Sequence, residues 1–509
     1  MRKDTWILKY INGKNHSGIY LTISDIYTLL FLYEQRLLTV KQLYTFNSYF
    51  HNEPMNYNAF RNRLNKMSNL KLLKKENYYL KKRYGYEMNM FTIGDKGLFI
   101  LEQAGFIKNA KENFYISRKQ YEHTLGIKEV VLQTIELEAN RKGWILGLNG
   151  DLTYVFKNFI KEYGINNLYP FTLWPNHPHF IYESDEWGFH KNLGQSVRDK
   201  RTQKDDVLYS IQPFPLFKDI KEEDNNLKPD WIFRINKHFL SIEVDTGTER
   251  NNIIESKIKK YITLSKLMPT INHHVIFSIV DNSYPTVSDH GTKKQRTANL
   301  KELIKNIPEL AASNLNVYVT PMRRIQAVMY QILEKTRVQR KQEQEFHNEI
   351  ISRLNNVITF PYTATLVNTE ESLKKLGFYH QGFLSKKLPV YHFQKKDEQN
   401  AKGLLEFDAI VIKMQEGNVN SYKDLSEVAQ LLVQSDSERG KLVMPRDTKI
   451  IAIYPKELEG TETSVIHDIF HSSASKQNVI LIRENDIRQF NPCFFDIQQR
   501  EMKLFEEFF

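Results

Sequence analysis

The stretch KPDWIFRINKHFLSIEVDTGTE, residues 228–249, decides the fold of the central part of the chain. Its first half predicts a turn that runs into a strand, and a second strand follows over residues 238–245. Alternation along the second strand places Glu243 and Asp245 on one face and the apolar Leu240, Ile242 and Val244 on the other. Two carboxylates therefore share a face, beside Asp230 at the start of the neighbouring strand.

The segments on either side of this hairpin predict an α/β domain. A helix is expected before it, over residues 125–140, and another after it, over residues 253–267. Two buried-type strands then follow, at residues 274–280 and 316–320. This order is typical of a small mixed sheet covered by helices.

The order of elements resembles the PD-(D/E)xK nucleases, with Pro229-Asp230, twelve residues, and then Glu243-x-Asp245. The resemblance implies that Asp230, Glu243 and Asp245 hold Mg²⁺ (or Mn²⁺), because hard carboxylate oxygens bind this ion and the ion neutralises charge on the scissile phosphate. The usual Lys of Glu-x-Lys is Asp245 here. The helix that follows offers Lys257, Lys259 or Lys260 in its place, and the predicted catalytic set is Asp230, Glu243, Asp245, Lys257 and Lys259.

Charge is concentrated near the N-terminus. The chain carries 71 Lys+Arg against 60 Asp+Glu, a net charge of +11. Residues 1–120 hold 20 Lys+Arg and 9 Asp+Glu, which is the whole excess of 11. A basic domain on a neutral body favours contact with a phosphate backbone, although a solvated lysine-rich surface is the alternative.

The same quarter of the chain predicts a winged helix-turn-helix. Helices are expected over residues 23–37, after Thr39, and after Asn56 or Asn58. Two strands (72–75 and 78–83), a third segment (86–93) and a helix (95–104) would complete the wing. The third helix would enter the major groove of double-stranded DNA. The predicted DNA-binding residues, which include a basic loop further along, are Arg61, Arg63, Lys66, Lys74, Lys75, Lys81, Lys82, Arg83, Lys293, Lys294 and Arg296.

Taken together, these segments resemble the replication-relaxation proteins of plasmids and other mobile elements. The stretches that carry the resemblance are Tyr121-Glu122-His123-Thr124-Leu125, Lys228-Pro229-Asp230, residues 242–249 and Lys259-Lys260-Tyr261. The resemblance implies DNA processing in replication or mobilisation, with other replication or transfer proteins as partners. His123, Glu249 and Tyr261 match the look of the family without an assigned role.

Three other functions remain open. A non-catalytic DNA-binding initiator or regulator would keep the nuclease fold as a scaffold, and a defence or restriction-type nuclease would use the same core. A relaxase with a His-hydrophobe-His motif is disfavoured, because the prolines around His177 and His179 indicate a loop rather than a strand.

The predicted domains are a winged helix (1–106), a nuclease-like α/β domain (120–330), a linker helix (331–356) and a C-terminal α/β domain (357–509). The last is expected to be a second nuclease-like copy without an active site, used for binding or dimerisation. In this hypothesis the strand at Asp408 parallels the strand at Asp230. An unrelated α/β domain is the alternative.

Composition predicts a cytoplasmic protein without a membrane span. No apolar run approaches the ~18 residues that a span needs, and no secretory signal is evident at the N-terminus. The single cysteine, Cys493, excludes an intrachain disulfide and a metal site with several cysteines.

Overall fold

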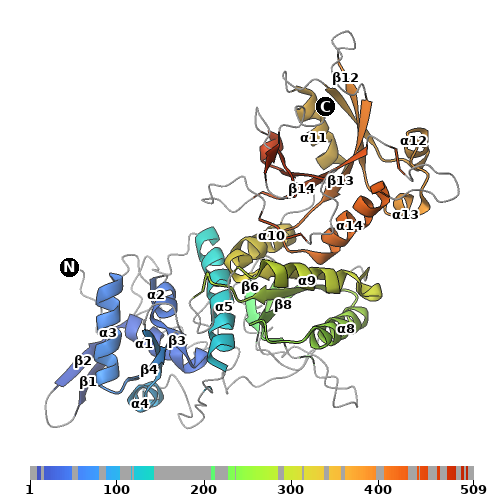
Figure 1. Cartoon of the computed structure of the whole chain (residues 1–509). Helices are drawn as coiled ribbons and strands as arrows, with labels where there is room; N and C mark the ends of the chain where they lie inside the picture. The colour runs from blue at the N-terminus through green and yellow to red at the C-terminus, as the bar shows by residue number, and fades with distance from the viewer. Residues whose placement is uncertain are drawn as a thin grey trace. The chain divides into compact units, whose positions relative to one another are not determined.

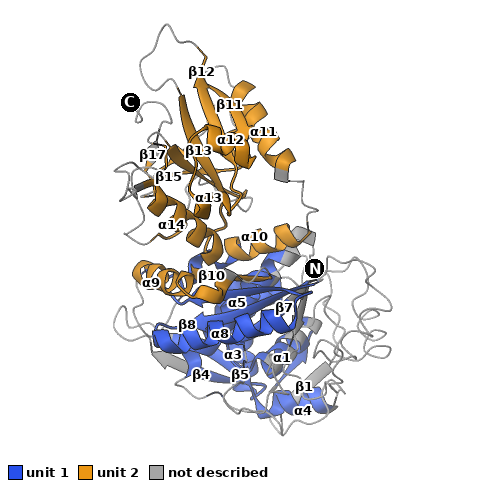
Figure 2. Ribbon diagram, turned by 90° about the vertical axis from the view of Figure 1, so that its right-hand side faces the viewer, with its two compact units in different colours: residues 1–293, 321–326 blue, residues 294–320, 327–509 orange. Residues whose placement is uncertain are grey.

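The structure is a computed structural model of the whole chain (Figure 1). It describes residues 8–142 and 208–502, apart from gaps at 13–16, 49–54, 80–86, 104–115, 117–119, 212–226, 228, 236, 285–291, 312–313, 338–342, 357–361, 397–405, 434–443, 446–447, 457–466, 471–478, 489–493 and 498–499. The chain forms two compact units (Figure 2). Unit 1 comprises residues 1–293 and 321–326, and unit 2 comprises residues 294–320 and 327–509. Both contain helices and sheets, which confirms the predicted multidomain α/β class.

Unit 1 begins with a hairpin of β1 (Leu8–Asn12) and β2 (Ser17–Leu21), and its N-terminal part contains four helices. They are α1 (Ile23–Gln35), α2 (Val40–Ser48), α3 (Tyr57–Asn69) and α4 (Asp95–Gln103). Thr22 and Asp25 form a capping box at the start of α1, and the side chain of Asn56 accepts a hydrogen bond from Asn58 N at the start of α3. The apolar face of α3, formed by Phe60, Leu64 and Met67, is buried.

A three-stranded sheet accompanies these helices, in the order β3 (Leu38–Thr39), β5 (Glu87–Ile93) and β4 (Leu73–Tyr79). The two separate strands predicted at 72–75 and 78–83 are wrong in this respect. Residues 73–79 form one continuous strand, because Lys74 to Tyr79 pair without interruption with Thr92 to Glu87. The polar Glu76 and Asn77 are unfavourable for a strand and suggested a break between two strands. Backbone pairing with β5 nevertheless continues through both residues.

The second sheet of unit 1 contains the quoted hairpin. Within unit 1, the strands of this sheet lie in the spatial order β9 (Asn272–Ile279), β8 (His238–Asp245), β7 (Trp231–Ile235) and β6 (Leu208–Ile211). β6 and β7 are antiparallel, β7 and β8 are antiparallel, and β8 and β9 are parallel. A parallel pair needs a crossover, and α8 (Asn251–Leu267) supplies it.

Helices cover both faces of β8. Gly126 of α5 (Tyr121–Lys142) packs against Val244, and a Cβ at Gly126 would lie 3.1 Å from that side chain. Tyr261 of α8 contacts Glu243, which points to the opposite face. Both faces are therefore enclosed, and Glu243 and Asp245 are buried rather than solvated.

Unit 2 contains a larger sheet in the order β11 (Tyr362–Val367), β12 (Val390–Lys395), β13 (Glu406–Lys413), β14 (Thr448–Tyr454), β15 (Val479–Arg483), β16 (Phe494–Phe495) and β17 (Glu501–Met502). Apolar clusters lie on both of its faces. One cluster includes α14 (Val419–Val433), and the other includes Ile350 and Leu354 of α11 (Glu343–Asn356).

The predicted linker helix over residues 331–356 is wrong in extent. The segment belongs to two helices, α10 (Ile325–Arg337) and α11. The many charged residues in this region obscured an apolar face on each helix. The residues that form these faces, Val328, Ile332, Ile350 and Leu354, are buried. These helices therefore pack into the fold rather than span solvent.

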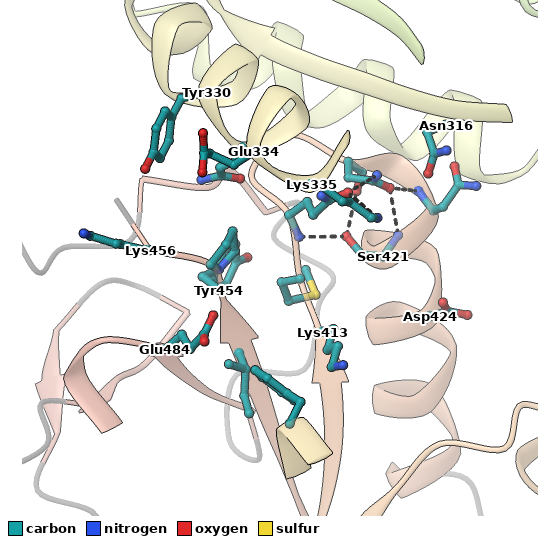
Figure 3. Close-up of a pocket in the computed structure, with 18 residues that line it drawn as sticks. Asn316, Tyr330, Glu334, Lys335, Lys413, Ser421, Asp424, Tyr454, Lys456 and Glu484 are labelled. Carbon is teal, nitrogen blue, oxygen red and sulfur yellow. Dashed lines mark hydrogen bonds between the residues drawn. The ribbon is translucent and has the colours of Figure 1, made fainter. Parts of the chain in front are cut away.

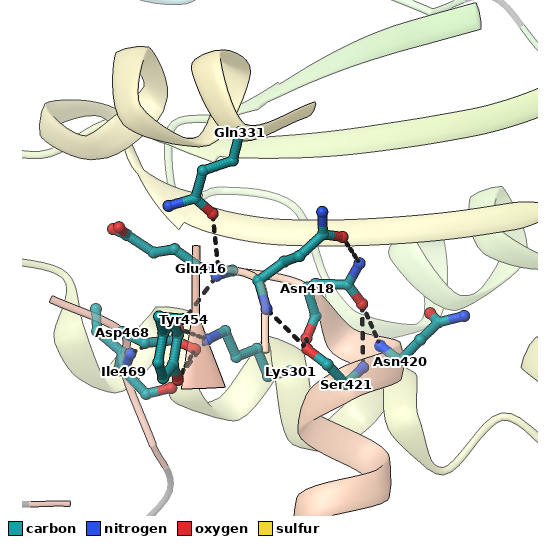
Figure 4. A network of polar contacts seen from close by, with 11 residues as sticks. Lys301, Gln331, Glu416, Asn418, Asn420, Ser421, Tyr454, Asp468 and Ile469 are labelled. Atoms are coloured by element: carbon teal, nitrogen blue, oxygen red, sulfur yellow. Dashed lines mark hydrogen bonds and ion pairs between the residues drawn. The ribbon is translucent and has the colours of Figure 1, made fainter. Parts of the chain in front are cut away.

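A buried ion pair fastens α9 (Lys294–Lys305) to the sheet of unit 2 (Figure 4). The ammonium of Lys301 donates to a carboxylate oxygen of Asp468 and to Ile469 O, and both charged side chains are only 1% exposed. Tyr454 and the Gly417 amide also donate to Asp468, at 2.8 and 3.2 Å. The pair is thus hydrogen-bonded as a buried charge requires. Among the described residues, none of the helices is long and apolar enough to cross a membrane.

Candidate functional site

The carboxylate of Asp230 lies where β7 begins and is held from two sides. Its Oδ2 accepts a hydrogen bond from Val244 N of β8 at 2.8 Å, and Nε2 of His123 lies 3.2 Å from the same atom. Asp230 N in turn donates to Ile242 O at 3.0 Å. The start of α5 and the hairpin thus fix this carboxylate together. Its other oxygen, Oδ1, has no hydrogen bond to the described residues.

Glu243 lies on the adjacent strand and is engaged at both oxygens. Tyr261 OH donates to Oε1 at 2.7 Å, and Lys257 Nζ donates to Oε2 at 3.0 Å. Lys257 also donates to Glu249 Oε1 at 2.8 Å. Because Lys257 and Tyr261 are four residues apart on α8, both point to the same strand.

The residues described so far form one cluster, which consists of Asp230, Glu243, Lys257, His123, Glu249 and Tyr261. The pKa values of several of its members are strongly shifted. Burial, and then the neighbouring charge of Asp230, raise the pKa of Glu243 to about 7, against the opposing effect of Lys257. Burial alone would lower the pKa of Lys257, but Glu243 and Glu249 outweigh it and the pKa of Lys257 is raised. The pKa of His123 is also raised, because its hydrogen bond and attraction to Asp230 exceed the cost of burial. Titratable groups whose pKa values are shifted by burial together with a specific charged partner are typical of functional sites.

Asp245 is directed to the turn after β8. Its Oδ1 accepts a hydrogen bond from Gly247 N at 2.6 Å, and Gly247 has a left-handed φ of 87°. Lys293 Nζ lies over this turn, 2.9 Å from where a Cβ of Gly247 would stand. The neighbouring Thr292 is anchored, since Arg323 donates to Thr292 O at 2.9 Å. The structure therefore brings one lysine of the basic loop to the edge of the site.

Arg323 owes its position to a buried carboxylate. It forms an ion pair with Asp281 at 2.7 Å, and Asp281 lies just after β9 with its side chain 1% exposed. The strand end, the arginine and the loop thus form one connected set in unit 1.

The carboxylate oxygens of the cluster are the type of ligand that a hard divalent cation prefers. Mg²⁺ commonly binds one or two carboxylates and keeps several waters, which Asp230 and Glu243 provide for. Glu243 would exchange its bond to Lys257 for the metal. Among the described residues, no group of three or more His, Cys, Asp or Glu side chains is arranged to hold a metal ion. Asp230 and Glu243 are thus the carboxylates best placed as ligands, while Asp245 binds the backbone of its own turn.

The lysines predicted on α8 separate clearly. Lys257 reaches Glu243, whereas Lys259 pairs with Glu255 at 2.7 Å on the surface and is 58% exposed. The structure therefore does not bring Lys259 into the carboxylate cluster.

The predicted DNA-binding residues divide into four groups. Arg61, Lys66 and Lys75 are exposed on α3 and β4. Arg63 and Lys74 form ion pairs instead, with Asp25 and Glu76. Of those on the basic loop, Lys293 is half-buried over Gly247, Lys294 is exposed and Arg296 is half-buried at the start of α9. The residues that lie outside the described part of the chain are Lys81, Lys82 and Arg83, and with them His177 and His179 of the relaxase alternative.

Sequence reasoning left three members of the cluster without a role. His123, Glu249 and Tyr261 lie 107, 19 and 31 residues along the chain from Asp230, and only the packing of α5 and α8 on the hairpin joins them. The spacing of Lys257 and Tyr261 by four residues is the one sequence feature that places both on a common helix face.

Unit 2 has a cavity of about 470 Å³ at the carboxyl ends of β13 and β14 (Figure 3). Charged residues of both signs line it, among them Glu334, Lys335, Lys413, Asp424, Lys456 and Glu484. Ends of parallel strands are a common place for ligands in α/β sheets. The charges nearly balance, so the cavity does not indicate one class of ligand.

Fold and site together define a multidomain α/β protein with a partly buried cluster of carboxylates, a lysine and a histidine. Residues 29–278 match the family model described as replication-relaxation. The chain belongs to this family through these residues, which run from α1 to β9 and include every member of the cluster. No curated protein and no solved structure shows a significant match to the chain. The family suggests a role in the replication or mobilisation of a plasmid or other mobile element.

Proposed function

We propose that this protein binds double-stranded DNA of a plasmid or mobile element and cleaves it in a Mg²⁺-dependent reaction during replication or mobilisation. The observation that carries the proposal is the cluster of Asp230, Glu243 and Lys257. Two carboxylates and an ammonium meet where β7 begins and β8 ends, and the order of the elements around them resembles that of the PD-(D/E)xK nucleases.

The N-terminal helices supply the DNA-binding part of the proposal. Three helices, the sheet β3-β5-β4 and α4 follow the order of a winged helix-turn-helix. Residues 1–120 carry the whole net positive charge of the chain. Unit 1 thus combines a basic DNA-facing part with the carboxylate cluster.

Each residue of the cluster has a chemical task in this proposal. Asp230 and Glu243 would hold the metal, which would supply a water of lowered pKa and neutralise charge on the scissile phosphate. Lys257, released from Glu243, lies beside the attacked phosphate and stabilises its developing negative charge. Glu249 retains Lys257 in place, because it is the second acceptor of the ammonium. His123 holds Asp230 in orientation from the opposite side.

Cleavage of a supercoiled plasmid tests the proposal. The plasmid carries the DNA that flanks the gene, and the protein is added with Mg²⁺, Mn²⁺ or EDTA. We expect metal-dependent relaxation or linearisation that Asp230→Asn and Glu243→Gln each abolish. Asp408→Asn is the matched control, because Asp408 also contacts a histidine, His392 at 2.9 Å, but lies in unit 2. Cleavage that survives both substitutions would refute this site.

A non-catalytic role as a DNA-binding initiator or regulator is favoured by one observation. Both oxygens of Glu243 are already engaged, and its raised pKa opposes the charged form that a metal requires. In that case the protein binds DNA in a salt-dependent manner without cleaving it. Isothermal titration with Mn²⁺ separates the two functions, since a scaffold shows no metal binding that Asp230→Asn removes.

A further inference from the structure

The exposed face of α3 has an unusual composition. Its polar side chains are Asn58, Arg61, Asn62, Asn65, Lys66 and Asn69. All are exposed except Asn65, which is half-buried. None of these side chains has a hydrogen bond or ion pair with another described residue. Within the described part of the chain, their donors and acceptors are thus not used by the protein itself.

Helix stability does not explain this face. Asn is a weak helix former because its amide competes for nearby backbone groups, and lysine, glutamate or alanine would serve an exposed helix better. Four asparagines nevertheless occupy positions 58, 62, 65 and 69, which form one stripe along the helix. Residues that break a local rule without a local gain are expected at functional surfaces.

The other faces of α3 hold the helix firmly. Phe60, Leu64 and Met67 are buried in the core. Arg63 Nε donates to Asp25 Oδ1 at 3.0 Å, and the same arginine donates to Tyr20 O. Asp25 belongs to the capping box of α1, so α3 is fixed against the start of α1. The asparagine stripe is thus presented on a rigid support.

We propose that this face reads adenine-containing sequence in the major groove of double-stranded DNA. The inference rests on the proposed DNA-binding function and names the sequence class that it selects. An asparagine amide makes two hydrogen bonds to adenine N6 and N7, which distinguishes adenine from the other bases. Arg61 contacts guanine or a phosphate, and Lys66 contacts a phosphate.

The dimensions of the stripe set the length of the recognised sequence. From Asn58 to Asn69 the helix rises roughly 16 Å, at about 1.5 Å per residue. This length corresponds to about five base pairs at ~3.4 Å each. The first residues of such a helix usually contact the bases, so Asn58 and Asn62 carry the selectivity.

Selection from a random duplex library with the full-length protein tests the inference. We expect enrichment of a core of about five base pairs that contains adenines. Replacement of a selected adenine is expected to weaken binding by about 5- to 150-fold, the discrimination of one bidentate contact. Asn62→Ala removes the preference at one position, whereas Asn62→Gln retains it, because glutamine also pairs with adenine N6 and N7.

Asn252→Ala is the matched control, since Asn252 is an exposed asparagine at the start of α8. It is expected to leave the selected sequence unchanged, and circular dichroism verifies that each variant is folded. Binding without sequence preference, or a selected core that Asn62→Ala leaves intact, would overturn this inference alone. Failure to bind any duplex would overturn the proposed DNA-binding function as well.

Discussion

The sheets of the two units share a strand order but differ at the edge where unit 1 has its carboxylates. In unit 1, β6, β7, β8 and β9 are joined by antiparallel, antiparallel and parallel pairings. In unit 2, β11, β12, β13 and β14 are joined in the same sequence of pairings. A helix connects the parallel pair in each, α8 in one and α14 in the other.

The registers align the two sheets residue by residue. The first hairpin pair is Trp231↔Ile242 in unit 1 and Val390↔Ile410 in unit 2. The last parallel pair is Asp245↔Ile279 in unit 1 and Lys413↔Ile453 in unit 2. Three residues separate Ile242 from Asp245, and three separate Ile410 from Lys413. Both ends of the ladder thus give one alignment.

This alignment corrects the predicted parallel between Asp408 and Asp230. Asp408 lies on β13, which corresponds to β8, at the position of Leu240. The counterparts of Asp230, Glu243 and Asp245 are Pro389, Val411 and Lys413. The error arose because both strands read as an acid followed by apolar residues, while the pairing partners that distinguish them are far apart in the sequence. Unit 2 keeps the framework and replaces the acids.

The largest expected effect is on the stability of unit 2, when a glutamate is introduced at the position that corresponds to Glu243. Val411→Glu places a carboxylate at a position that is 1% exposed and was filled by an apolar side chain. We expect a loss of about 3–5 kcal/mol in the free energy of unfolding, the scale of an uncompensated buried charge. Urea denaturation followed by far-UV circular dichroism measures it, because all five tryptophans precede residue 294 and report on unit 1.

Lys413→Glu is the control for this substitution. It introduces the same side chain two residues along, at an exposed position, and is expected to cost no more than about 1 kcal/mol. Equal effects of the two substitutions would contradict the assignment of Val411 to the buried position of Glu243.

Within unit 1, two lysines of α8 test whether the carboxylate cluster cleaves DNA. Lys257→Ala removes the ammonium at Glu243, and we expect the rate of DNA cleavage to fall by about 10²- to 10³-fold. Lys259→Ala removes a surface pair with Glu255 and is expected to leave the rate unchanged. Single-turnover cleavage of a labelled duplex measures both rates. Similar losses in the two variants would indicate that both lysines act by binding DNA.

The sequence predicted the hairpin and its acids because strand alternation and turn residues are local properties. It also predicted the helix that supplies a lysine, but it placed Lys257 and Lys259 in the catalytic set together, with Lys260 as a further candidate. The choice depends on which of them faces Glu243 once α8 packs on the sheet. His123 and Lys293 reach the site through contacts with segments far along the chain, at Asp230 and Gly247. Periodicity along one segment carries no information about such pairings.

Two buried groups, one in each unit, are expected to contribute to the acid response in opposite directions. Burial lowers the pKa of His273 to about 4, so the unfolded state takes up its proton first as the pH falls. Unit 1 therefore loses about 3 kcal/mol between roughly pH 6.5 and pH 4 from this group. Burial raises the pKa of Asp486 in unit 2, so its contribution is present at low pH and is lost as the pH rises. His273→Phe is expected to flatten the pH dependence of tryptophan-detected unfolding, and an unchanged slope would count against a neutral buried His273.

The smallest expected effects concern two glycines that follow the matched strands. Gly247 and Gly417 have φ values of 87° and 76°, which an alanine adopts only with strain. At Gly247 a new Cβ meets the flexible end of Lys293, so Gly247→Ala is expected to cost about 1–2 kcal/mol from backbone strain. At Gly417 it meets the backbone oxygen of Val319 at 3.1 Å, which cannot move aside as easily, and the loss is expected to be larger. Urea denaturation of both variants measures the difference. If Gly247→Ala also lowers the rate of DNA cleavage while Gly417→Ala does not, Lys293 belongs to the cleavage site. The turn at Gly247 would then have a functional role that the turn at Gly417 lacks. A greater loss of stability at Gly247 than at Gly417 would instead show that Lys293 is held as rigidly as backbone.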